Sequence, residues 1–307
     1  MRLHPAEKFD NRALPTRFIH VEPLAAAMGA EITGVSIAAL TDEAFAEIHA
    51  ALFRHKMIFF RGQKLSHGEH DAFSLRFGPA AEDAYTQGVA GHDHVQPVIK
   101  EANDRSRMVF GSGWHTDSPF LPQPPAITSL RAVEVPPFGG DTIWANSALA
   151  YSVLSETYRQ MISGLRVHFS MRNVLRTAQE AVELRDTPMG RLAATRDAGA
   201  LPEHLRRKVE GSLHPIVRTH PVTGEKALYL DGTYAVGIEG MADEEARPIL
   251  DFLLSFMIQH EFTCRLRWEP GTVAVWDNRL CVHQAFNDYP GHRRELYRTT
   301  VAGEAPV

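Results

Sequence analysis

The sequence has few cysteines and no long apolar segment, and both absences exclude classes of protein. Only 2 cysteines occur among 307 residues, too few for a disulfide scaffold. We expect Cys264 and Cys281 to be buried free thiols, with a soft metal ligand as the less favoured role of Cys281. No stretch approaches the ~20 apolar residues of a membrane span, and residues 1–14 lack the apolar core of a signal peptide. The sequence predicts a cytoplasmic protein without a membrane partner.

An excess of positive charge is also absent, with 32 Lys and Arg against 37 Asp and Glu. The formal net charge is −5, and the densest basic run, Arg206-Arg207-Lys208, is flanked by Glu203 and Glu210. So short a run can neutralise few phosphates, and a solvated helix face is its expected role. We therefore do not expect nucleic acid as a partner.

What the sequence does contain is enough apolar material for a large core. Hydrophobic residues make up 44% of the chain and charged residues 22%. All-β enzymes often exceed ~200 residues as one domain. We expect residues 1–307 to form a single domain, and by default a homo-oligomer, because symmetric homo-oligomers are common.

Short segments rich in β-branched and aromatic residues recur along the chain. They predict strands at residues 17–22, 57–60, 98–100, 129–133, 141–145, 165–170, 227–229, 262–268, 272–276 and 295–301. Two helices are predicted, one from about Asp42 with Thr41 as its N-cap and one from Ser66 to Phe77. Many short strands and few helices predict a mainly β fold with flanking helices, a jelly roll whose mouth can hold a ligand.

Residues 173–212 interrupt this pattern. They are rich in Arg, Glu, Ala and Thr, show no strand alternation, and are long for a connection inside one domain. We interpret them as a partly helical lid insertion. The alternative is a variable insertion that packs on the barrel or makes an oligomer contact.

His115 and Asp117 are separated by one residue, a spacing that can place both side chains on one side of a strand or of a strand-to-loop junction. Two imidazoles and one carboxylate hold iron in many non-haem sites and leave the opposite face of the metal open. The pair therefore supplies two of three candidate ligands, and the third can come from any distant segment that folds back.

Two other pairs in the chain have the same spacing. His67 and Glu69 begin the second predicted helix, where such residues diverge, and Glu69 matches the capping-box partner of Ser66. His20 and Glu22 end the first predicted strand, with no second histidine pattern nearby. Neither pair is interpreted as a metal site.

A block near the C-terminus contains a candidate for the third ligand and two arginines. His283 follows the predicted strand at residues 272–276 and precedes two arginines, Arg294 and Arg298. If residues 295–301 form a strand, these arginines share one face, whereas Arg293 points to the other and belongs to a surface charge cluster.

Three motifs together resemble a known family. They are Trp-His-Thr-Asp at residues 114–117, Gly-Gly-Asp-Thr-Ile-Trp at 139–144, and the block from Trp276 to Arg298. With them the chain resembles the taurine dioxygenase/TfdA family of Fe(II)- and 2-oxoglutarate-dependent dioxygenases. Residues 29–35 and 59–63 also look like family landmarks, so the resemblance covers nearly the whole chain.

The resemblance implies a double-stranded β-helix with Fe(II) held by His115, Asp117 and His283, and with 2-oxoglutarate and dioxygen as cosubstrates. It also implies that Thr142 and Arg294 bind the far carboxylate of 2-oxoglutarate. An arginine suits this task because its planar guanidinium can donate two parallel hydrogen bonds to one carboxylate.

The position of Arg298 implies a small anionic substrate, because in the family this arginine reaches toward the iron-bound carboxylate and the substrate's acid group. Residues 110–113 and 79–84 lack the asparagine and histidine of taurine dioxygenase, which argues against taurine itself. Residues 101–104, 262–265 and 298–303 look closest to the aryloxyalkanoate branch that includes the (R)-dichlorprop dioxygenases. The implied reaction is hydroxylation of an aryloxyalkanoate, alkyl sulfate or sulfonate, with ether or ester cleavage where the oxidised carbon carries that oxygen.

Two other functions use the same ligands. A hydrolase or isomerase could hold zinc and activate water, and a jelly-roll binding protein could use the cavity without catalysis. Neither has a use for Thr142 and Arg294, and neither consumes dioxygen. The sequence favours the oxygenase.

Overall fold

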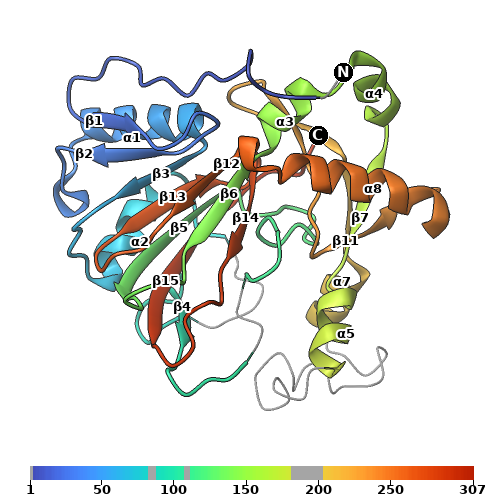
Figure 1. Cartoon of the computed structure of the whole chain (residues 1–307). Coiled ribbons are helices and arrows are strands. Elements are labelled where there is room, and N and C mark those ends of the chain that lie inside the picture. The colour runs from blue at the N-terminus through green and yellow to red at the C-terminus, as the bar shows by residue number, and fades with distance from the viewer. Residues whose placement is uncertain (1–2, 82–87, 107–110, 181–202) are drawn as a thin grey trace.

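A seven-stranded sheet is the largest element of the computed structural model, which describes residues 3–81, 88–106, 111–180 and 203–307. In spatial order its strands are β1 (His20–Pro23), β2 (Ala30–Thr33), β3 (Met57–Phe60), β13 (Val273–Asp277), β5 (Ile127–Glu134), β15 (Arg294–Val301) and β4 (Gln96–Lys100). All neighbours are antiparallel except β2 and β3. Strand β13 lies between β3 and β5, so the sheet forms only when both halves of the chain meet (Figure 1).

A second sheet, β12 (Thr263–Leu266), β6 (Thr142–Asn146) and β14 (Cys281–Ala285), lies across one face of the first (Figure 1). The space between the two sheets is apolar. Trp144 on β6 and Trp276 on β13 have ring centroids 5.6 Å apart, and Leu130 and Leu296 are buried in the same cluster. Burial of these side chains, at roughly 25 cal/mol per Å² of apolar surface, holds the two sheets together.

Two helices cover the other face of the large sheet. Helix α1 (Asp42–His55) begins after Thr41, whose side chain accepts a hydrogen bond from the Ala44 N–H, and α2 (His67–Leu75) begins with the Ser66–Glu69 capping box. Both N-terminal signals predicted from sequence are confirmed, and so is the interpretation of His67 and Glu69 as the start of a helix. The helices bury Ile48, Leu52 and Phe73 against the sheet.

A further apolar core forms beside the two sheets. It packs α3 (Ser147–Val153), α4 (Glu156–Ile162) and α8 (Asp243–Met257) against a third sheet. That sheet contains β11 (Ala235–Ile238), β7 (Arg166–Phe169) and β8 (Ser212–Pro215), and β9 (Val217–Thr219) pairs with β10 (Lys226–Leu228) nearby. The described residues also form two short 3-10 helices, η1 (Ile37–Ala39) and η4 (His260–Phe262).

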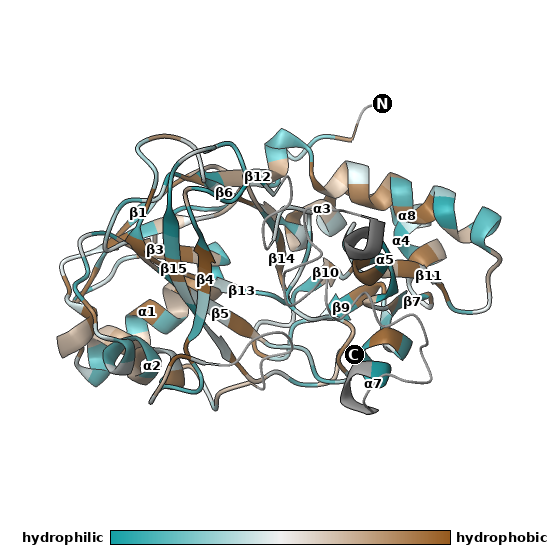
Figure 2. Cartoon of the chain, turned by 90° about the horizontal axis from the view of Figure 1, so that it is seen from below, coloured by the Kyte–Doolittle hydropathy of each residue, from teal (hydrophilic) through white to brown (hydrophobic). Residues whose placement is uncertain are grey.

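The segment predicted to be a lid is helical at both ends, in α5 (Arg172–Glu180) and α7 (Glu203–Glu210). Residues 181–202, on which the lid prediction mainly rests, lie outside the part of the chain that the structure describes. The parts of α5 and α7 that are coloured in Figure 2 carry both hydrophilic and hydrophobic residues.

The prediction of a mainly β fold with flanking helices is confirmed, with differences in detail. The predicted strand at residues 17–22 is wrong at its beginning, because β1 starts at His20. The N–H groups of residues 17–19 donate instead to the carboxylate of Glu47 on α1, at 2.8, 2.9 and 3.2 Å. Strands β2, β8, β9, β11 and β14 and helices α3, α4 and α8 were not predicted.

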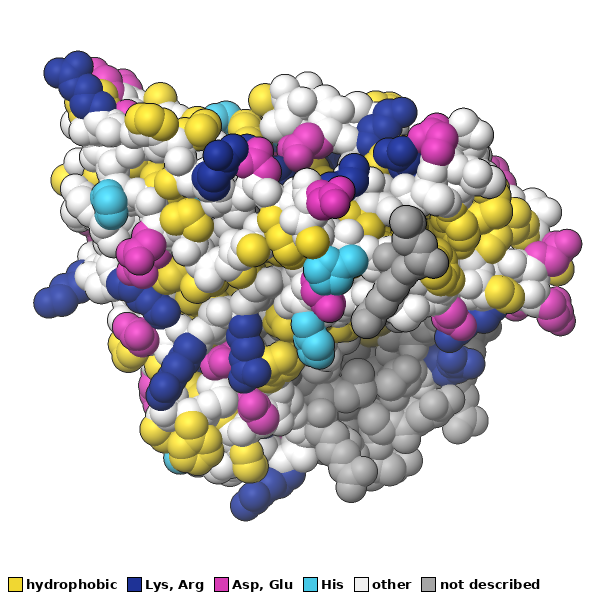
Figure 3. Space-filling view, turned by 45° about the horizontal axis from the view of Figure 1, so that its top comes forward, with side chains coloured by type: hydrophobic (Ala, Val, Ile, Leu, Met, Phe, Trp, Pro, Cys, Tyr) yellow, Lys and Arg dark blue, Asp and Glu magenta, His cyan; other side chains and the backbone are white. Residues whose placement is uncertain are grey.

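The surface carries charges of both signs. On the face shown in Figure 3, Lys and Arg side chains are interspersed with Asp and Glu, with hydrophobic side chains between them. Among the helices that the structure describes, none combines the length and apolar character needed to cross a bilayer.

Candidate active site

Two histidines that are far apart in the sequence face each other through paired backbone hydrogen bonds. The N–H of His115 donates to the carbonyl of His283 at 3.0 Å, and the N–H of His283 donates to the carbonyl of His115 at 2.8 Å. His283 lies on β14, while His115 forms an isolated bridge within a loop. Their ring centroids are 4.1 Å apart.

Asp117 brings a carboxylate to the same point. Its Oδ1 lies 3.8 Å from His115 Nε2 and 4.0 Å from His283 Nε2, and all three residues are buried. These distances are too long for hydrogen bonds but suit three ligands around one ion, because metal–nitrogen and metal–oxygen bonds are about 2.0–2.2 Å long. Within the described residues this is the only such group of histidine, cysteine and acidic side chains.

The protonation states also suit a metal. The Nδ1 of His115 donates to the carbonyl of Gly113 at 2.8 Å, which leaves the lone pair of Nε2 directed at the site. Burial holds the pKa of His283 well below its ordinary value, so its ring is neutral. Burial raises the pKa of Asp117, but the charges around it, including the Arg298 guanidinium, outweigh burial and lower that pKa.

One cavity contains all six residues singled out from the sequence. Apolar and small side chains form the rest of its wall. Its lining residues are Val98, Gly111, His115, Asp117, Leu130, Thr142, Trp276, His283, Ala285, Arg294 and Arg298.

Arg294 and Thr142 present unused donors to this cavity. Arg294 is 4% exposed, and its Nε and Nη2 have no hydrogen-bond partner among the described residues. Unused donors on a buried cation favour an anionic ligand, which can accept from both and balance the charge. The Thr142 hydroxyl oxygen accepts from Trp268 Nε1 at 2.9 Å, so its hydrogen can be donated elsewhere. The two side chains thus fit one carboxylate of a bound acid.

The prediction that Arg294 and Arg298 share one face of the last strand, with Arg293 on the other, is confirmed. Arg294 and Arg298 are both buried on β15 and line the cavity, and Arg298 Nη1 is 3.6 Å from Asp117 Oδ1. Arg293 points away and forms ion pairs with Glu101 and Glu134 at 3.1 and 2.6 Å.

Several residues that support the site were not identified from the sequence. The Asp231 carboxylate accepts hydrogen bonds from the backbone N–H groups of Thr233, Tyr234 and Thr116 at 3.0, 2.6 and 3.2 Å. The carboxyl group is fully buried, which raises its pKa to about 6. Its loop therefore fixes the backbone between the first two candidate ligands. Asp-Gly-Thr in sequence indicates only a turn, so nothing in it pointed to this role.

The cysteines have the predicted role. Cys264 and Cys281 are free and buried. Burial raises the pKa of both thiols, and Cys281 Sγ donates to the carbonyl of Asp277 at 3.2 Å. The thiol is thus directed at a backbone oxygen and is not among the three candidate ligands.

Comparison with known proteins agrees with this geometry. The profile of the taurine catabolism dioxygenase TauD, TfdA family matches residues 20–300. An alpha-ketoglutarate-dependent sulfate ester dioxygenase of Pseudomonas putida is 36% identical over 94% of this chain and 91% of the relative. An alkylsulfatase of Acinetobacter baylyi is 32% identical over 94% of this chain and 87% of the relative.

A solved structure shows the same similarity. A taurine dioxygenase from Burkholderia xenovorans with a known crystal structure has 36% sequence identity to this chain. Its structure superimposes with a TM-score of 0.76, over 95% of this chain and 93% of that one. The likeness in sequence and the likeness in fold therefore extend over nearly the whole chain.

Proposed function

Because the chain belongs to the TauD/TfdA family and is an Fe(II)- and 2-oxoglutarate-dependent dioxygenase, we propose that His115, Asp117 and His283 are its iron ligands. The observation that carries this proposal is the convergence of two imidazole nitrogens and one carboxylate oxygen within 4.8 Å of one another. A zinc hydrolase or isomerase and a non-catalytic binding protein would leave the unused donors of Arg294 unexplained.

Arg294 and Thr142 are the proposed binding residues for the far carboxylate of 2-oxoglutarate. The free Nε and Nη2 of Arg294 form the fork that a carboxylate oxygen pair matches. The Thr142 hydroxyl adds a neutral donor from β6. Arg294 lies four residues along β15 from Arg298, whose Nη1 is 3.6 Å from Asp117 Oδ1, so a carboxylate bound at Arg294 leaves the keto-acid end of the cosubstrate free to reach the metal ligands.

When bound, iron and 2-oxoglutarate activate dioxygen, release succinate and carbon dioxide, and insert one oxygen atom into a substrate C–H bond. The residues of this chain orient the reactants and exclude water. Arg298 places a cation beside Asp117, where the acid group of an anionic substrate can pair with it. Val98, Leu130 and Trp276 provide apolar walls for the rest of the substrate.

A sulfate ester is the substrate class we propose first. The Pseudomonas relative acts on sulfate esters by name, and its likeness extends over 94% of this chain. Hydroxylation of the carbon that bears the ester oxygen gives a hemiacetal-type sulfate, which collapses into an aldehyde and hydrogen sulfate. The reaction needs one anion-binding cation and an apolar wall, and the cavity has both.

Aryloxyalkanoates are the second candidate, because residues 101–104, 262–265 and 298–303 resemble the aryloxyalkanoate branch of the family. Their carboxylate would pair with Arg298 as a sulfate would, and the same hydroxylation would cleave the aryl ether.

The test is succinate formation from 2-oxoglutarate in air by protein loaded anaerobically with Fe(II). We expect alkyl sulfates to stimulate turnover most, with release of sulfate, and His115→Ala to abolish it. Stimulation by aryloxyalkanoates alone would replace the sulfate-ester proposal with the second candidate. Bound iron without turnover on alkyl sulfates, sulfonates, phosphonates or aryloxyalkanoates would contradict both.

We further propose that residues 1–307 form one oxygenase domain of double-stranded β-helix architecture, with 173–212 as a lid, and that it works in the cytoplasm as a homo-oligomer. His283 on β14 of one sheet and Arg294 and Arg298 on β15 of the facing sheet line the same cavity, which supports the fold proposal. Two buried free thiols suit a reducing compartment. Limited proteolysis with and without substrate tests the lid, and sedimentation tests the assembly.

A further inference from the structure

A chain of hydrogen bonds links the interior of the fold to Asp117. Trp276 Nε1 donates to Asn278 Oδ1 at 2.9 Å, and Asn278 Nδ2 donates to Thr128 Oγ1 at 2.8 Å. The Thr128 hydroxyl in turn donates to Asp117 Oδ2 at 2.5 Å. The chain joins β13, the turn that follows it, β5 and the loop of the candidate ligands.

The two end groups, the Trp276 indole and the Asp117 carboxylate, determine which atom donates in each of these hydrogen bonds. An indole N–H can only donate, so the Asn278 atom facing Trp276 must be the oxygen, and the amide nitrogen must face Thr128. The threonine oxygen then accepts that hydrogen and has only its own hydrogen to offer. An ionised carboxylate can only accept, so Asp117 receives it. Any reversal would leave a buried donor without an acceptor.

We propose that Thr128 is a positioning residue that occupies Asp117 Oδ2 and so directs Oδ1 alone at the metal. The proposal rests on the proposed role of Asp117 as an iron ligand. Oδ1 is the oxygen that lies 3.8 and 4.0 Å from the two histidine Nε2 atoms. A carboxylate held in this way cannot rotate to present both oxygens, and the position that a second oxygen would occupy stays open for cosubstrate.

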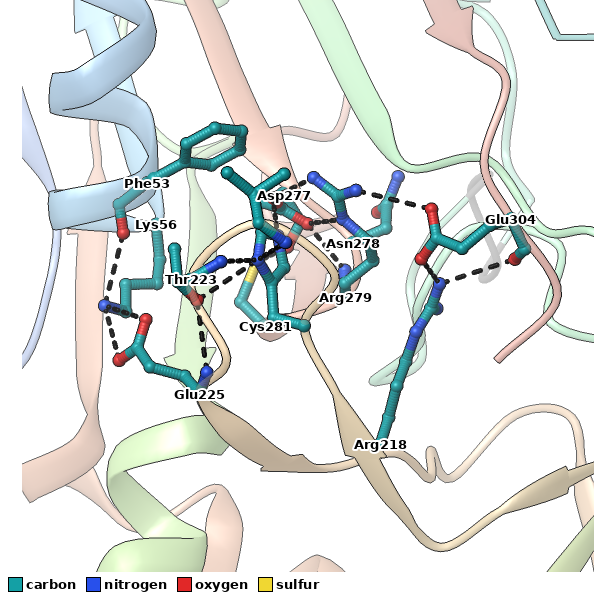
Figure 4. Close-up of polar contacts among 12 residues, drawn as sticks. Phe53, Lys56, Arg218, Thr223, Glu225, Asp277, Asn278, Arg279, Cys281 and Glu304 are labelled. Atoms are coloured by element: carbon teal, nitrogen blue, oxygen red, sulfur yellow. Dashed lines mark hydrogen bonds and ion pairs between the residues drawn. The ribbon is translucent and has the colours of Figure 1, made fainter. Parts of the chain in front are cut away.

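Asn278, in the middle of this series of hydrogen bonds, is held rigidly by its own backbone. The Asn278 N–H donates to the carbonyl of Ala126 at 2.8 Å, and its carbonyl accepts from the Thr116 hydroxyl at 2.9 Å. Asp277 and Arg279, on either side of it, form a buried ion pair that keeps the turn closed (Figure 4). Asn278 therefore supports Asp117 through Thr128 and the adjoining backbone through Thr116.

Water cannot substitute for the threonine hydroxyl. Thr128 is 0% exposed, Asn278 2% and Asp117 4%. In such a place the loss of the hydroxyl leaves both the carboxylate oxygen and the asparagine N–H without a partner. Removing a residue that hydrogen-bonds to a metal ligand typically weakens metal binding about 10- to 100-fold.

Metal affinity is the measurement that tests this role. Apo protein is titrated with Co(II), binding is measured by equilibrium dialysis, and the visible absorption reports ligand geometry. We expect Thr128→Val, which keeps the volume and loses the hydroxyl, to raise the Co(II) Kd about 10- to 100-fold and to alter the spectrum. Thr128→Ser, which keeps the hydroxyl, should bind like the unaltered protein.

Two controls separate this role from others. Thr299 lies on the neighbouring strand β15, on the face turned away from the proposed metal ligands, and its buried hydroxyl pairs with Ser74 Oγ at 2.5 Å. Thr299→Val removes this hydroxyl and should leave the Co(II) Kd unchanged. His115→Ala should abolish binding, and if it does not, the proposed iron site itself fails. If His115→Ala does abolish binding, an unchanged Kd and spectrum in Thr128→Val would overturn the positioning role alone.

Two further results would also overturn it, namely an equal loss in Thr128→Ser or an equal loss in Thr299→Val. Should Thr128→Val not fold, Thr128→Ala takes its place, because it also removes the donor without adding bulk. An unchanged Kd in Thr128→Ala would overturn the proposal in the same way.

Discussion

Gly111 shows at the residue scale how tightly the site is built. Its φ of +81° lies in the region that favours glycine, and a Cβ there would lie 3.1 Å from Cε1 of His115. Its carbonyl also accepts from the N–H of Ala285 at 2.8 Å. A side chain at this position must therefore displace the imidazole of a proposed ligand.

We predict that Gly111→Ala weakens Co(II) binding by about tenfold, equivalent to about 1.4 kcal/mol, because the ring moves off its position. The control is Gly240→Ala, where φ is +75° but no atom lies within 4 Å of the added Cβ. It has the same backbone strain without the clash. Equal Kd values for the two variants would show that the contact with His115 does not matter.

The proposed cosubstrate clamp gives a second prediction at this scale. Arg294→Lys replaces a planar fork by a point charge, so the KM for 2-oxoglutarate should rise about 10- to 100-fold. Arg293→Lys is the matched control, since the neighbouring side chain points to solvent and pairs with Glu101 and Glu134. Steady-state succinate assays measure both. If the two substitutions change KM alike, Arg294 does not bind the cosubstrate.

At the scale of elements, α2 is attached to the large sheet through a buried histidine. His70 Nε2 pairs with the Ser129 hydroxyl of β5 at 2.9 Å, and burial lowers the pKa of His70 to about 3. In the unfolded chain the ring has a pKa near 6.5. Stability from the neutral ring is therefore complete above pH 6.5 and is lost as the pH falls toward 3.

We predict that His70→Gln removes about 1.4 kcal/mol per pH unit from the slope of unfolding free energy between pH 6 and 4. Urea unfolding at several pH values measures this slope. His20→Gln, whose side chain is exposed on β1, should leave the slope as it is. An unchanged slope in His70→Gln would mean that the buried ring is not the group that titrates.

The turn between β13 and β14 depends on a buried charge pair (Figure 4). Asp277 accepts from Arg279 Nε and Nη2 at 2.8 and 2.6 Å, and from His220 Nε2 at 3.0 Å. Burial raises the pKa of Asp277, but these partners outweigh burial and hold the pKa well below its usual range. This stabilisation is present above the unfolded pKa near 3.9 and is lost as the pH falls below it.

We predict that Asp277→Asn costs about 3–5 kcal/mol at neutral pH, because it breaks a buried ion pair and leaves Arg279 with Glu304, at 3.4 Å, as its remaining carboxylate. The cost should shrink below pH 4, where the native carboxylate begins to lose its advantage over the unfolded chain. Chemical unfolding at pH 7 and pH 3 measures both. Asp251→Asn, which breaks an exposed pair with Arg247 on α8, should change almost nothing.

At the scale of the whole molecule, the proposed iron ligands join separate parts of the fold. His283 lies on the three-stranded sheet, while Asp117 is held by Thr128 on the seven-stranded sheet. A metal bound between them ties the two sheets together and favours the folded state by mass action.

We predict that Co(II) at about 100 times its Kd adds about 2.7 kcal/mol to the free energy of unfolding and raises Tm. 2-Oxoglutarate added with the metal should raise Tm further, and a chelator should reverse both shifts. His115→Ala serves as the control and should show neither shift. A Tm that does not respond to metal in the unaltered protein would mean that the ion is not held between the sheets.

The sequence by itself determined the chemistry of the site. The spacing of His115 and Asp117, the alternation of Arg294 and Arg298 on one strand, and the likeness of the motifs to a family depend only on local geometry and residue type. The capping box at Ser66 likewise excluded His67 and Glu69, because it is a local hydrogen-bond pattern. Such short-range features are fully present in the linear order of residues.

Only the tertiary structure decided what holds those residues in place. Thr128 and Asp231 are single polar residues without a spacing pattern, and Asn278 lies in a motif that does not reveal its partner. Each acquires its partner only when distant parts of the chain pack together. The direction of a hydrogen bond, the burial that prevents water from replacing it, and the contact behind Gly111 depend on three-dimensional neighbours. Nothing in the order of residues encodes these neighbours locally, so the supporting network could be found only in the folded chain.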